Sequence, residues 1–360
     1  MKIVVFAGGV GTRLWPVSRK NSPKQFEKIL GDKSTLQQTI ERLLPTYKPT
    51  DIYIATGKRY KEIVVGQLPQ IPKQNFIFEP QMRDVGPAIG LAGTILAKKY
   101  PNEPMAILWS DHLVKNNKSF IQMLLLAEES ISAKKADFIF IAQKARFANQ
   151  NMGWIEVGDV MQEKDGISVY SFKKLFYRPG LSEAVSFFGN KHFVWNLGYF
   201  VTTPKYLSSL FNAFVPGMHE KLMDIASVYG TNGFYEKLEA VYPTLQKVSF
   251  DDAILVKIKP DNILVVSSDL GWSDVGAWES LKEALAESKE ENVTKGKVLL
   301  EDSRDNLVFN YNDQLVVGIN LVDMLVINTG DVILVCPKIA VPKIKKLVEG
   351  LAGTPHEHLA

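Results

Sequence analysis

The sequence contains almost no cysteine, no long apolar run and little net charge, and each of these absences excludes a class of protein. Cys336 is the one cysteine among 360 residues, so no disulfide can form within the chain. No stretch approaches the roughly 18 consecutive apolar residues needed to span a bilayer. The N-terminus begins directly with a strand-like run and shows no signal-peptide pattern. We therefore expect a globular protein located in the cytoplasm, without membrane attachment.

The small net charge argues against nucleic acid as a partner. The chain has 42 Lys and Arg against 39 Asp and Glu, a formal charge of +3. The positive residues are unevenly spread, because the first thirty residues contain six Lys or Arg and a single acid, Glu27. A local excess of this kind suits a small anionic ligand.

Short apolar runs alternate with amphipathic segments over the first two thirds of the chain, which predicts an α/β fold with a mainly parallel sheet. In such a sheet a ligand binds beyond the carboxyl ends of the strands. Ser34 and Ser119 are the predicted N-caps of two helices. The predicted strands are KIVVFAG, DIYIATG, NFIFEP, PMAILWSDH and DFIFIA, and the predicted helices are STLQQTIERLLP, PAIGLAGTILAKKY and SFIQMLLLAEESISAKK.

The pattern changes twice farther along the chain. From about residue 154, the segments WIEVGD, ISVYSFKKLF and FVWNLGYFVTT read as strands around a helix at GLSEAVSFFG. After the charged segment AESKEENVTKGK, short strands are separated by Asn, Asp and Gly turns, until a helix at PKIKKLVEGLAG. We expect a catalytic domain over residues 1–284 and a small β-rich domain over residues 295–360, of the stacked-arcade or left-handed β-helix kind.

A glycine loop follows the first predicted strand. Gly8, Gly9 and Gly11 permit positive φ and let backbone N–H groups approach phosphate oxygens. Arg13 and Lys24 add positive charge nearby. The spacing matches neither a Walker A loop nor GxGxxG, so the glycines by themselves also fit a tight turn between strand and loop.

Several collinear motifs resemble one family. AGGVGTRLWPVSR and SPKQF are close to the signature of the sugar-phosphate nucleotidyltransferases, specifically the mannose-1-phosphate guanylyltransferases. The resemblance implies a Rossmann-like, GT-A-like catalytic domain with helices on both faces of a mixed, mainly parallel sheet, followed by a small β domain. The further matching motifs are FEPQMRDVGPAI (78–89), WSDHLV (109–114), WNLGYF (195–200), FDDAILVK (250–257) and GWSDVGAWESL (271–281).

Two aspartates form the expected metal site. Asp111 ends a buried strand and Asp274 lies in a loop, so a fold that brings both loops over one sheet edge creates a two-carboxylate site suited to Mg²⁺. Taken singly, each also fits a turn or helix cap; the resemblance assigns both to the metal. His112 is expected to orient neighbouring groups, because a sugar 1-phosphate is mostly dianionic at neutral pH and needs no general base. Arg13, Lys24, Asp111 and Asp274 are the expected catalytic residues.

The resemblance also implies a nucleotide site. Its second segment departs from the family pattern EPxxRNTAPA, because Asp84 replaces an Asn and Val85 replaces a Thr. Strictness for guanine therefore stays open. The expected nucleotide-binding residues are Ala7, Gly8, Gly9, Gly11, Thr12, Arg13, Glu79, Arg83, Pro87 and Asp111.

The expected sugar side departs further from the family. Tyr177 and Arg178 stand where the family has the Glu and Lys of a Glu-Lys-Pro element, and Val256 stands at the Glu of SIDYAxMEK. Arg178 can replace Lys as a phosphate partner, whereas Tyr177 cannot accept two hydroxyl hydrogen bonds as a carboxylate does. The expected sugar-phosphate-binding residues are Gly153, Tyr177, Arg178, Asn196, Asp251 and Lys257.

The resemblance implies that this chain transfers GMP from GTP to a hexose 1-phosphate, mannose 1-phosphate above all, and releases pyrophosphate. Mg²⁺ is the expected cofactor, and a homodimer is the expected assembly, since a small β domain has strand edges to cover. Two other interpretations stay open: a related nucleotidyltransferase with another nucleotide or sugar phosphate, and a non-catalytic protein that binds a nucleotide sugar.

Overall fold

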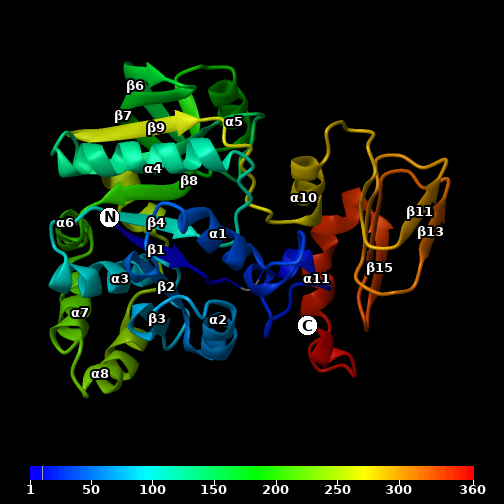
Figure 1. Ribbon diagram of the computed structural model, residues 1–360, viewed down its shortest axis with the longest axis horizontal. Helices are drawn as coiled ribbons and strands as arrows, with labels where there is room; N and C mark the ends of the chain where they lie inside the picture. Colours follow the sequence, from blue (N-terminus) through cyan, green and yellow to red (C-terminus); the bar gives the residue numbers. More distant parts are fainter. Residues whose placement is uncertain (10) are drawn as a thin grey trace. The chain divides into compact units, whose positions relative to one another are not determined.

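The computed structural model describes residues 1–9 and 11–360, which form two compact units (Figure 1). Each unit combines segments that are distant in sequence. The first unit contains residues 1–8, 41–110 and 115–270. The second contains residues 9–40, 111–114 and 271–360. The chain therefore crosses between the units within the glycine loop, after residue 40, on both sides of the segment that begins with Asp111, and after residue 270.

The first unit is built on a mixed sheet. Within the described residues it has nine strands in the order β3-β2-β1-β4-β8-β5-β9-β7-β6. The pairs β1–β2, β1–β4, β2–β3 and β5–β9 are parallel, whereas β8 is antiparallel to both β4 and β5. The strands are β1 (Lys2–Phe6), β2 (Ile52–Gly57), β3 (Phe76–Glu79), β4 (Met105–Trp109), β5 (Phe138–Lys144), β6 (Gly153–Lys164), β7 (Ile167–Tyr177), β8 (Phe193–Thr202) and β9 (Ile263–Ser268).

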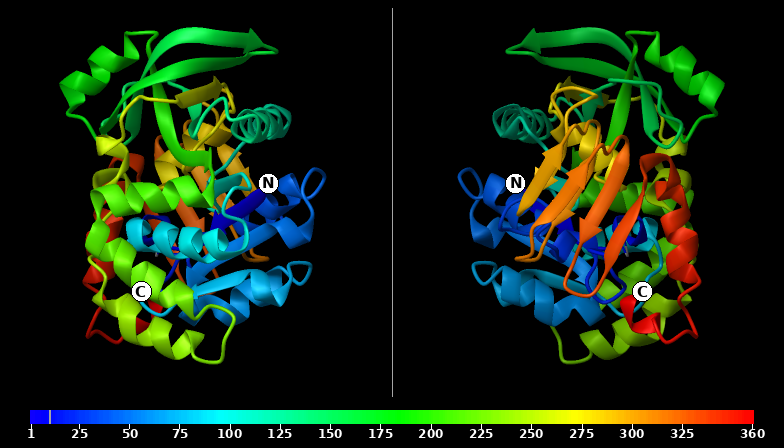
Figure 2. Two further views of the ribbon diagram at one scale, coloured as in Figure 1. Left: turned by 90° about the vertical axis from the view of Figure 1, so that its left-hand side faces the viewer. Right: turned by 90° about the vertical axis from the view of Figure 1, so that its right-hand side faces the viewer.

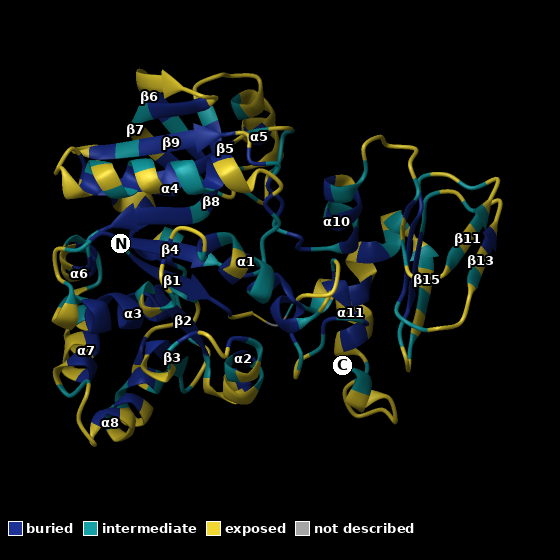
Figure 3. Cartoon of the chain, in the orientation of Figure 1, coloured by how far each residue is buried: buried dark blue, intermediate teal, exposed yellow. Residues whose placement is uncertain are grey.

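The central strands are buried on both faces, as their continuous apolar sequences predict. Every residue of β1, KIVVF, is buried, and Figure 3 shows β1, β4 and β8 in dark blue. The mixed α/β fold expected from the sequence is confirmed. All of the predicted strands of this region form, and β6 and β7 make a long hairpin.

Helices cover the sheet. On one face α3 packs with α6, α7 and α9 over a core that includes Phe6, Phe140 and Phe200. Helix α4 packs on β5, β8 and β9, with its exposed residues in yellow in Figure 3. The helices are α1 (Thr35–Leu43, shared between the units), α2 (Lys61–Gln67), α3 (Val85–Lys99), α4 (Asn117–Ser132), α5 (Leu181–Phe188), α6 (Pro204–Phe214), α7 (Pro216–Ser227), α8 (Phe234–Val241) and α9 (Phe250–Ala253).

One of the two predicted helix caps is confirmed and the other is wrong. Ser34 Oγ accepts a hydrogen bond from the N–H of Gln37 at 3.2 Å, and the Gln37 side chain accepts one from the Ser34 N–H, a reciprocal cap of α1. Helix α4 instead begins after Asn116, whose Oδ1 accepts from the N–H of Ser119 at 3.0 Å. Because Asn caps at least as well as Ser, the helix starts earlier than its apolar pattern indicates.

The second unit ends in a β-rich region of stacked parallel strands. Strands β10, β12 and β14 pair in parallel, as do β11 and β13, and β15 is antiparallel to β14. Figure 2 shows these strands in orange. The elements are α10 (Trp278–Leu285), β10 (Val293–Lys295), β11 (Val298–Glu301), β12 (Leu307–Asn310), β13 (Val316–Ile319), β14 (Met324–Asn328), β15 (Ile333–Pro337), the 3₁₀ segment η8 (Lys338–Lys343) and α11 (Ile344–Glu349).

Apolar residues and asparagines stack between successive turns of this region. Val293, Leu307 and Leu325 are in register on three neighbouring strands and are buried. At the strand ends, Asn328 Nδ2 donates to Asn310 Oδ1 at 2.9 Å. The asparagines satisfy backbone groups that the turns leave without partners, which explains the Asn-rich composition of the segment.

A second core joins this region to the start of the chain. Trp278 is buried against Leu14 and Trp15, and its Nε1 donates to the Trp15 carbonyl at 2.9 Å. Cys336 is half-buried at the edge of the same core. None of the helices in the described part of the chain is both long and apolar enough to span a bilayer.

Glu79 makes an unusual contact at the end of β3. Its carboxylate accepts a hydrogen bond from the hydroxyl of the buried Tyr242 at 2.5 Å. Burial raises the pKa of Glu79 to about 7, and the Tyr242 hydrogen bond only partly offsets this. The folded protein therefore holds a proton on Glu79 over a pH range in which the unfolded chain has lost it.

The raised pKa of this half-buried carboxyl predicts a pH-dependent stability. The pKa of Glu79 rises on folding from 4.5 to about 7, so its contribution to stability falls as the pH rises through that window, by roughly 2 to 3 kcal/mol. Glu79→Gln keeps an acceptor for Tyr242 and removes the titration. Urea unfolding at about pH 5 and about pH 8 should show the variant gaining roughly that amount over the native protein at the higher pH.

The matched control is Glu239→Gln, because Glu239 is exposed and pairs with Lys58 on the surface. It should follow the native pH dependence. An equal pH dependence in Glu79→Gln and the native protein would contradict the assignment.

Candidate functional site

Lys24 joins two loops that are far apart in sequence. Its ammonium lies 3.0 Å from Asp111 Oδ2 and donates to the carbonyls of Asp274 at 2.9 Å and Val275 at 3.2 Å. The two loops are also paired directly, since Leu113 and Ser273 exchange backbone hydrogen bonds. Both predicted metal-binding aspartates therefore meet at one lysine, inside the second unit.

We call Arg13, Lys24, Asp111 and Asp274 the Lys24 cluster. Lys24 is only 8% exposed, so its charge is held in place by these acceptors. Burial by itself would raise the pKa of Asp111, but the Lys24 ammonium and His112 outweigh it, and the pKa lies below its usual range. Asp111 is thus an anion at neutral pH, as a metal ligand must be.

Two glycines allow the cluster to close. Gly11 has φ +60°, and a Cβ there would lie 2.8 Å from Ser18 Oγ and 3.0 Å from Lys24 Cγ. At Gly276, a Cβ would lie 2.8 Å from Asp274 Oδ2 and 3.3 Å from Arg13 Nη2. Gly276 therefore leaves room for the Asp274 carboxylate and the Arg13 guanidinium beside the same backbone.

The remaining glycine-loop residues divide between the units. Ala7 continues β1, because its N–H donates to the Ala55 carbonyl at 2.8 Å, and Gly8 follows it in the first unit. Gly9 has φ +104° and is exposed in the second unit, and Thr12 begins a 3₁₀ turn there. Val10, in the middle of this loop, lies outside the described residues.

Gln25 was not among the predicted site residues. It is buried next to Lys24, and its Nε2 donates to the Gly9 carbonyl at 3.3 Å, so it fixes the glycine loop on the Lys24 turn. The position of Gln25 inside the PKQF motif is the sequence feature that could have identified it as a site residue.

His112 lies beside the cluster. Its ring packs edge-on against Trp272 with centroids 4.9 Å apart, and Nε2 lies 3.8 Å from Asp111 Oδ1. The histidine is therefore held between an aromatic wall and the carboxylate. This position suits the orienting role expected from the sequence, which stays a prediction.

The donor set fits a magnesium ion. In the described residues no group of three or more His, Cys, Asp and Glu side chains is arranged as a metal cage. Asp111 and Asp274 provide oxygen donors from two adjoining loops, and Mg²⁺ commonly takes only one or two carboxylates besides water and phosphate. The side chains present are thus compatible with Mg²⁺. Within the described part of the chain, they do not form the closed cage of protein ligands that some other metal ions need.

The segment expected to read the base starts helix α3 in the first unit. Asp84 has φ +69° and caps α3, accepting from the Val85 N–H at 2.8 Å. Asp and Asn are both good caps and both tolerate positive φ, which explains why Asp can replace the family's Asn. Pro87 lies in the first turn, where no helical N–H is needed.

The two charged residues of this segment differ in their contacts. Glu79 is bonded to Tyr242, as described above. Arg83 donates from Nη2 to Gln81 Oε1 at 3.0 Å, and its Nε is buried without a hydrogen-bond partner among the described residues. A buried donor without a protein partner is what a bound acceptor would satisfy.

Three of the predicted sugar-side residues lie at one level of the sheet. Gly153 on β6 is opposite Tyr177 on β7 and opposite Asn196 on β8. A Cβ at Gly153 would lie 3.1 Å from Asn196 Cβ, so the glycine lets the strands approach. Arg178 follows with φ +50°, and its guanidinium lies 5.0 Å from the Tyr177 ring centroid.

Asp251 joins this group from helix α9. Asn196 Nδ2 donates to Asp251 Oδ1 at 3.2 Å. Burial raises the pKa of Asp251 to about 6; Asp252 and Asp84 add to the shift, while Arg178 opposes it. We call Gly153, Tyr177, Arg178, Asn196 and Asp251 the Arg178 cluster. The fold thus brings these predicted residues together within the first unit.

Among the described residues, Lys257 and Val256 form no hydrogen bond or ion pair with the side chains of this cluster. Lys257 Nζ donates to the carbonyl of Ala253 at 3.0 Å, which closes its own turn. Val256 is 39% exposed. Burial raises the pKa of Tyr177, and Asp251 adds to the shift, as do Asp252 and Asp84, two acids that were not predicted as site residues.

Comparisons with known proteins give the family. A family model described as nucleotidyl transferase matches residues 2–291. A mannose-1-phosphate guanylyltransferase of Escherichia coli is 31% identical, over 97% of this chain and 75% of that protein. Mannose-1-phosphate guanylyltransferase ManC of Salmonella typhimurium is 31% identical, over 99% of this chain and 74% of its own length.

A solved structure agrees with these relatives. The crystal structure of a protein named mannose-1-phosphate geranyltransferase, from Thermus thermophilus, superimposes with a TM-score of 0.85 at 27% identity and covers 97% of this chain and 98% of that one. Because the family model and the named relatives each match most of the chain, this protein belongs to the nucleotidyltransferases and, among them, to the mannose-1-phosphate guanylyltransferases.

Proposed function

We propose that this enzyme transfers GMP from GTP to mannose 1-phosphate and releases pyrophosphate. The observation that carries the proposal is the Lys24 cluster, in which a buried cation is held by Asp111 and by the backbone of Asp274. The similarity to enzymes named mannose-1-phosphate guanylyltransferase supports the sugar and the nucleotide. Residues 1–284 would supply the catalytic domain, and residues 295–360 the small β-rich domain.

The reaction is a single displacement at phosphorus. A phosphate oxygen of the sugar 1-phosphate forms a bond to the α-phosphorus of GTP, and the bond from that phosphorus to the bridging oxygen of the β-phosphate breaks. The electron pair leaves with pyrophosphate, and the product is GDP-mannose. Since the attacking phosphate is mostly dianionic at neutral pH, no protein group has to remove a proton.

The protein contributes position and charge. The exposed Arg13 guanidinium and the Lys24 ammonium belong to the loop that begins with the glycines, so they would neutralise the charge that develops on the leaving pyrophosphate. Backbone N–H groups of the glycine loop would hold the triphosphate. Asp111 and Asp274 would hold Mg²⁺, which when bound supplies further positive charge at the phosphates.

The Arg178 cluster would bind the sugar phosphate. Arg178 offers a guanidinium to the phosphate, and Asn196 and Asp251 offer hydrogen-bonding groups to sugar hydroxyls. Since Tyr177 replaces the family's acid, another manno-configured sugar 1-phosphate is the second candidate substrate. A screen of four nucleoside triphosphates against several sugar 1-phosphates separates the two.

A binding protein without catalysis is the weaker alternative. Such a protein would need neither two cations nor two carboxylates at the triphosphate end, yet this chain has all four in one cluster. Pyrophosphate release on mixing the enzyme with GTP, Mg²⁺ and mannose 1-phosphate distinguishes them.

Removing the charge of Asp274 should abolish turnover. In the native protein the Gly276 N–H donates to Asp274 Oδ1 at 3.2 Å. Asp274→Asn keeps the size of the side chain and a side-chain oxygen that can accept this hydrogen bond. We expect pyrophosphate release to fall about a hundredfold or more, because the carboxylate is proposed to hold the metal during phosphoryl transfer. Asp159→Asn, at an exposed hairpin position, is the control and should keep full activity; native activity in Asp274→Asn would refute the metal assignment.

Removing the charge of Arg178 should weaken sugar-phosphate binding selectively. Asn tolerates the φ of +50° at this position, so Arg178→Asn removes the guanidinium without adding backbone strain. We expect the KM for mannose 1-phosphate to rise about tenfold to a hundredfold, with the KM for GTP nearly unchanged. Lys174→Ala removes an exposed cation on β7, the strand that ends just before Arg178, and should change neither constant. A rise confined to GTP would contradict the proposed role.

We also propose that the chain forms a homodimer through the β-rich region. Several apolar side chains there are exposed, among them Val317 and Ile319 on β13 at 53% and 63%, and contiguous apolar surface of this kind is commonly covered by association. Light scattering should give twice the mass of one chain for the native protein and a monomer for Ile319→Lys. A native monomer would exclude the dimer.

A further inference from the structure

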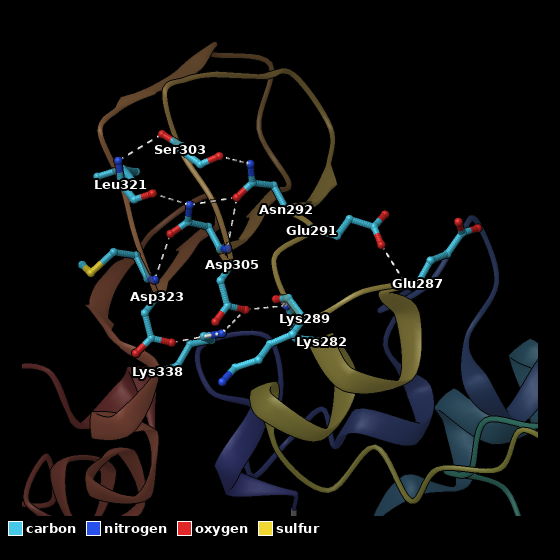
Figure 4. Close-up of polar contacts among 12 residues, drawn as sticks. Lys282, Glu287, Lys289, Glu291, Asn292, Ser303, Asp305, Leu321, Asp323 and Lys338 are labelled. Atoms are coloured by element: carbon cyan, nitrogen blue, oxygen red, sulfur yellow. Dashed lines mark hydrogen bonds and ion pairs between the residues drawn. The ribbon is translucent and has the colours of Figure 1, made fainter.

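Asp305 holds two lysines on one carboxylate oxygen. The ammonium groups of Lys282 and Lys338 both form ion pairs with Asp305 Oδ1. The Lys282, Asp305 and Lys338 side chains are only 6%, 15% and 14% exposed. Figure 4 shows the three side chains converging from helix α10, from the turn before β12 and from the start of η8. We call these residues the Asp305 clamp.

The backbone around Asp305 is held in place independently of the clamp. Asp305 has φ +58°, and its N–H donates to the Glu290 carbonyl at 2.8 Å. The next residue, Asn306, is completely buried and donates from Nδ2 to Asn292 Oδ1 at 2.9 Å and to the Leu321 carbonyl at 2.8 Å. The carboxylate is thus presented from a rigid turn, while the lysines reach it from other elements.

Lys282 connects the clamp to the loop that carries Asp274. It lies in the last turn of α10, and its ammonium also donates to the Lys289 carbonyl at 2.5 Å. At the other end of α10, Trp278 packs in the second core and bonds to the Trp15 carbonyl. The loop directly before α10 contains the carbonyls that hold Lys24. The position of α10 therefore determines the position of the Asp274 loop.

Asp305 is one of two acids that neutralise the two lysines of the clamp. Lys338 has a second acid, Asp323, at 3.0 Å, whereas the only acid paired with Lys282 among the described residues is Asp305. Two ammonium groups on one oxygen are close neighbours, and without the carboxylate they would repel each other. The repulsion would push the end of α10 away from η8.

We propose that Asp305 is a positioning residue for the Asp274 loop. By pairing with Lys282, Asp305 holds α10 on the β-rich region. It thereby keeps Asp274 and the carbonyls that bind Lys24 in place. Its catalytic consequence rests on the function proposed above. The β-rich region is then part of the catalytic apparatus, although none of its residues belongs to the Lys24 cluster.

The first test measures the mobility of the Asp274 loop directly and does not depend on enzymatic activity. Hydrogen–deuterium exchange is compared over residues 271–278 in the native protein and Asp305→Asn, with β1 as internal reference. We expect exchange of Gly276 and its neighbours to rise about tenfold or more, with β1 unchanged. Asp313→Asn removes an exposed ion pair with Lys297 in the same region and should leave both segments at the native rate.

The second test separates positioning from loss of folded protein. If Asp274 is displaced, turnover should fall about tenfold to a hundredfold, the Mg²⁺ concentration for half-maximal activity should rise several-fold, and the KM for mannose 1-phosphate should stay the same. A smaller folded fraction would lower turnover and leave both the Mg²⁺ midpoint and the exchange of the folded molecules unchanged, and that result would overturn the inference.

A second variant decides the case if Asp305→Asn does not fold. Lys282→Met keeps the apolar stem of the side chain and the Asp305–Lys338 pair, but removes the link to α10. It should raise exchange over residues 271–278 in the same way, and native exchange there would refute the proposal. The absence of pyrophosphate release in the native protein would refute the proposed function instead, while the exchange experiments would still decide the role of Asp305.

Discussion

The buried ammonium of Lys24 is the interaction on which the Lys24 cluster depends. It needs acceptors because a charge cannot stay unpaired at 8% exposure, and it finds them on Asp111 and on the backbone of Asp274 and Val275. One cation thereby fixes the distance between two loops that bear carboxylates. Its own charge also keeps Asp111 ionised, which is the form that the proposed metal site requires.

The two groups of predicted residues belong to different compact units. The Lys24 cluster lies in the second unit, and the Arg178 cluster and the Glu79–Pro87 segment lie in the first. Each group is built by local means: small residues at Gly276 and Gly153 admit neighbouring side chains, and caps such as Asp84 orient helix starts. The residues proposed to act on the triphosphate thus belong to one unit, and those proposed to recognise the base and the sugar belong to the other.

The departures from the family pattern have different physical meanings. Asp84 preserves capping and positive φ, so the exchange of Asn for Asp is locally conservative. Tyr177 changes the chemistry of its position, since a phenol stacked with Arg178 replaces a carboxylate. Around it, Asp251, Asp252 and Asp84 supply negative charge. Aspartates from α9 and from the start of α3 thus partly replace the negative charge that the family's acidic residue would have at the position of Tyr177.

The sequence by itself predicted the strands, most helices and the residue types of both clusters, because continuous apolar runs, helical apolar spacing and strand-end glycines are local properties. It also named Lys24, Asp111 and Asp274 individually as expected site residues. It could not place Ser119 correctly, since Asn116 competes for the cap, nor reveal Gln25 or the Asp305 clamp. Only the tertiary structure decided these, because pairing Leu113 with Ser273, or Lys282 with Asp305, depends on which distant segments meet. Such long-range contacts follow from the packing of the whole chain and cannot be predicted from the spacing of residues in a local segment.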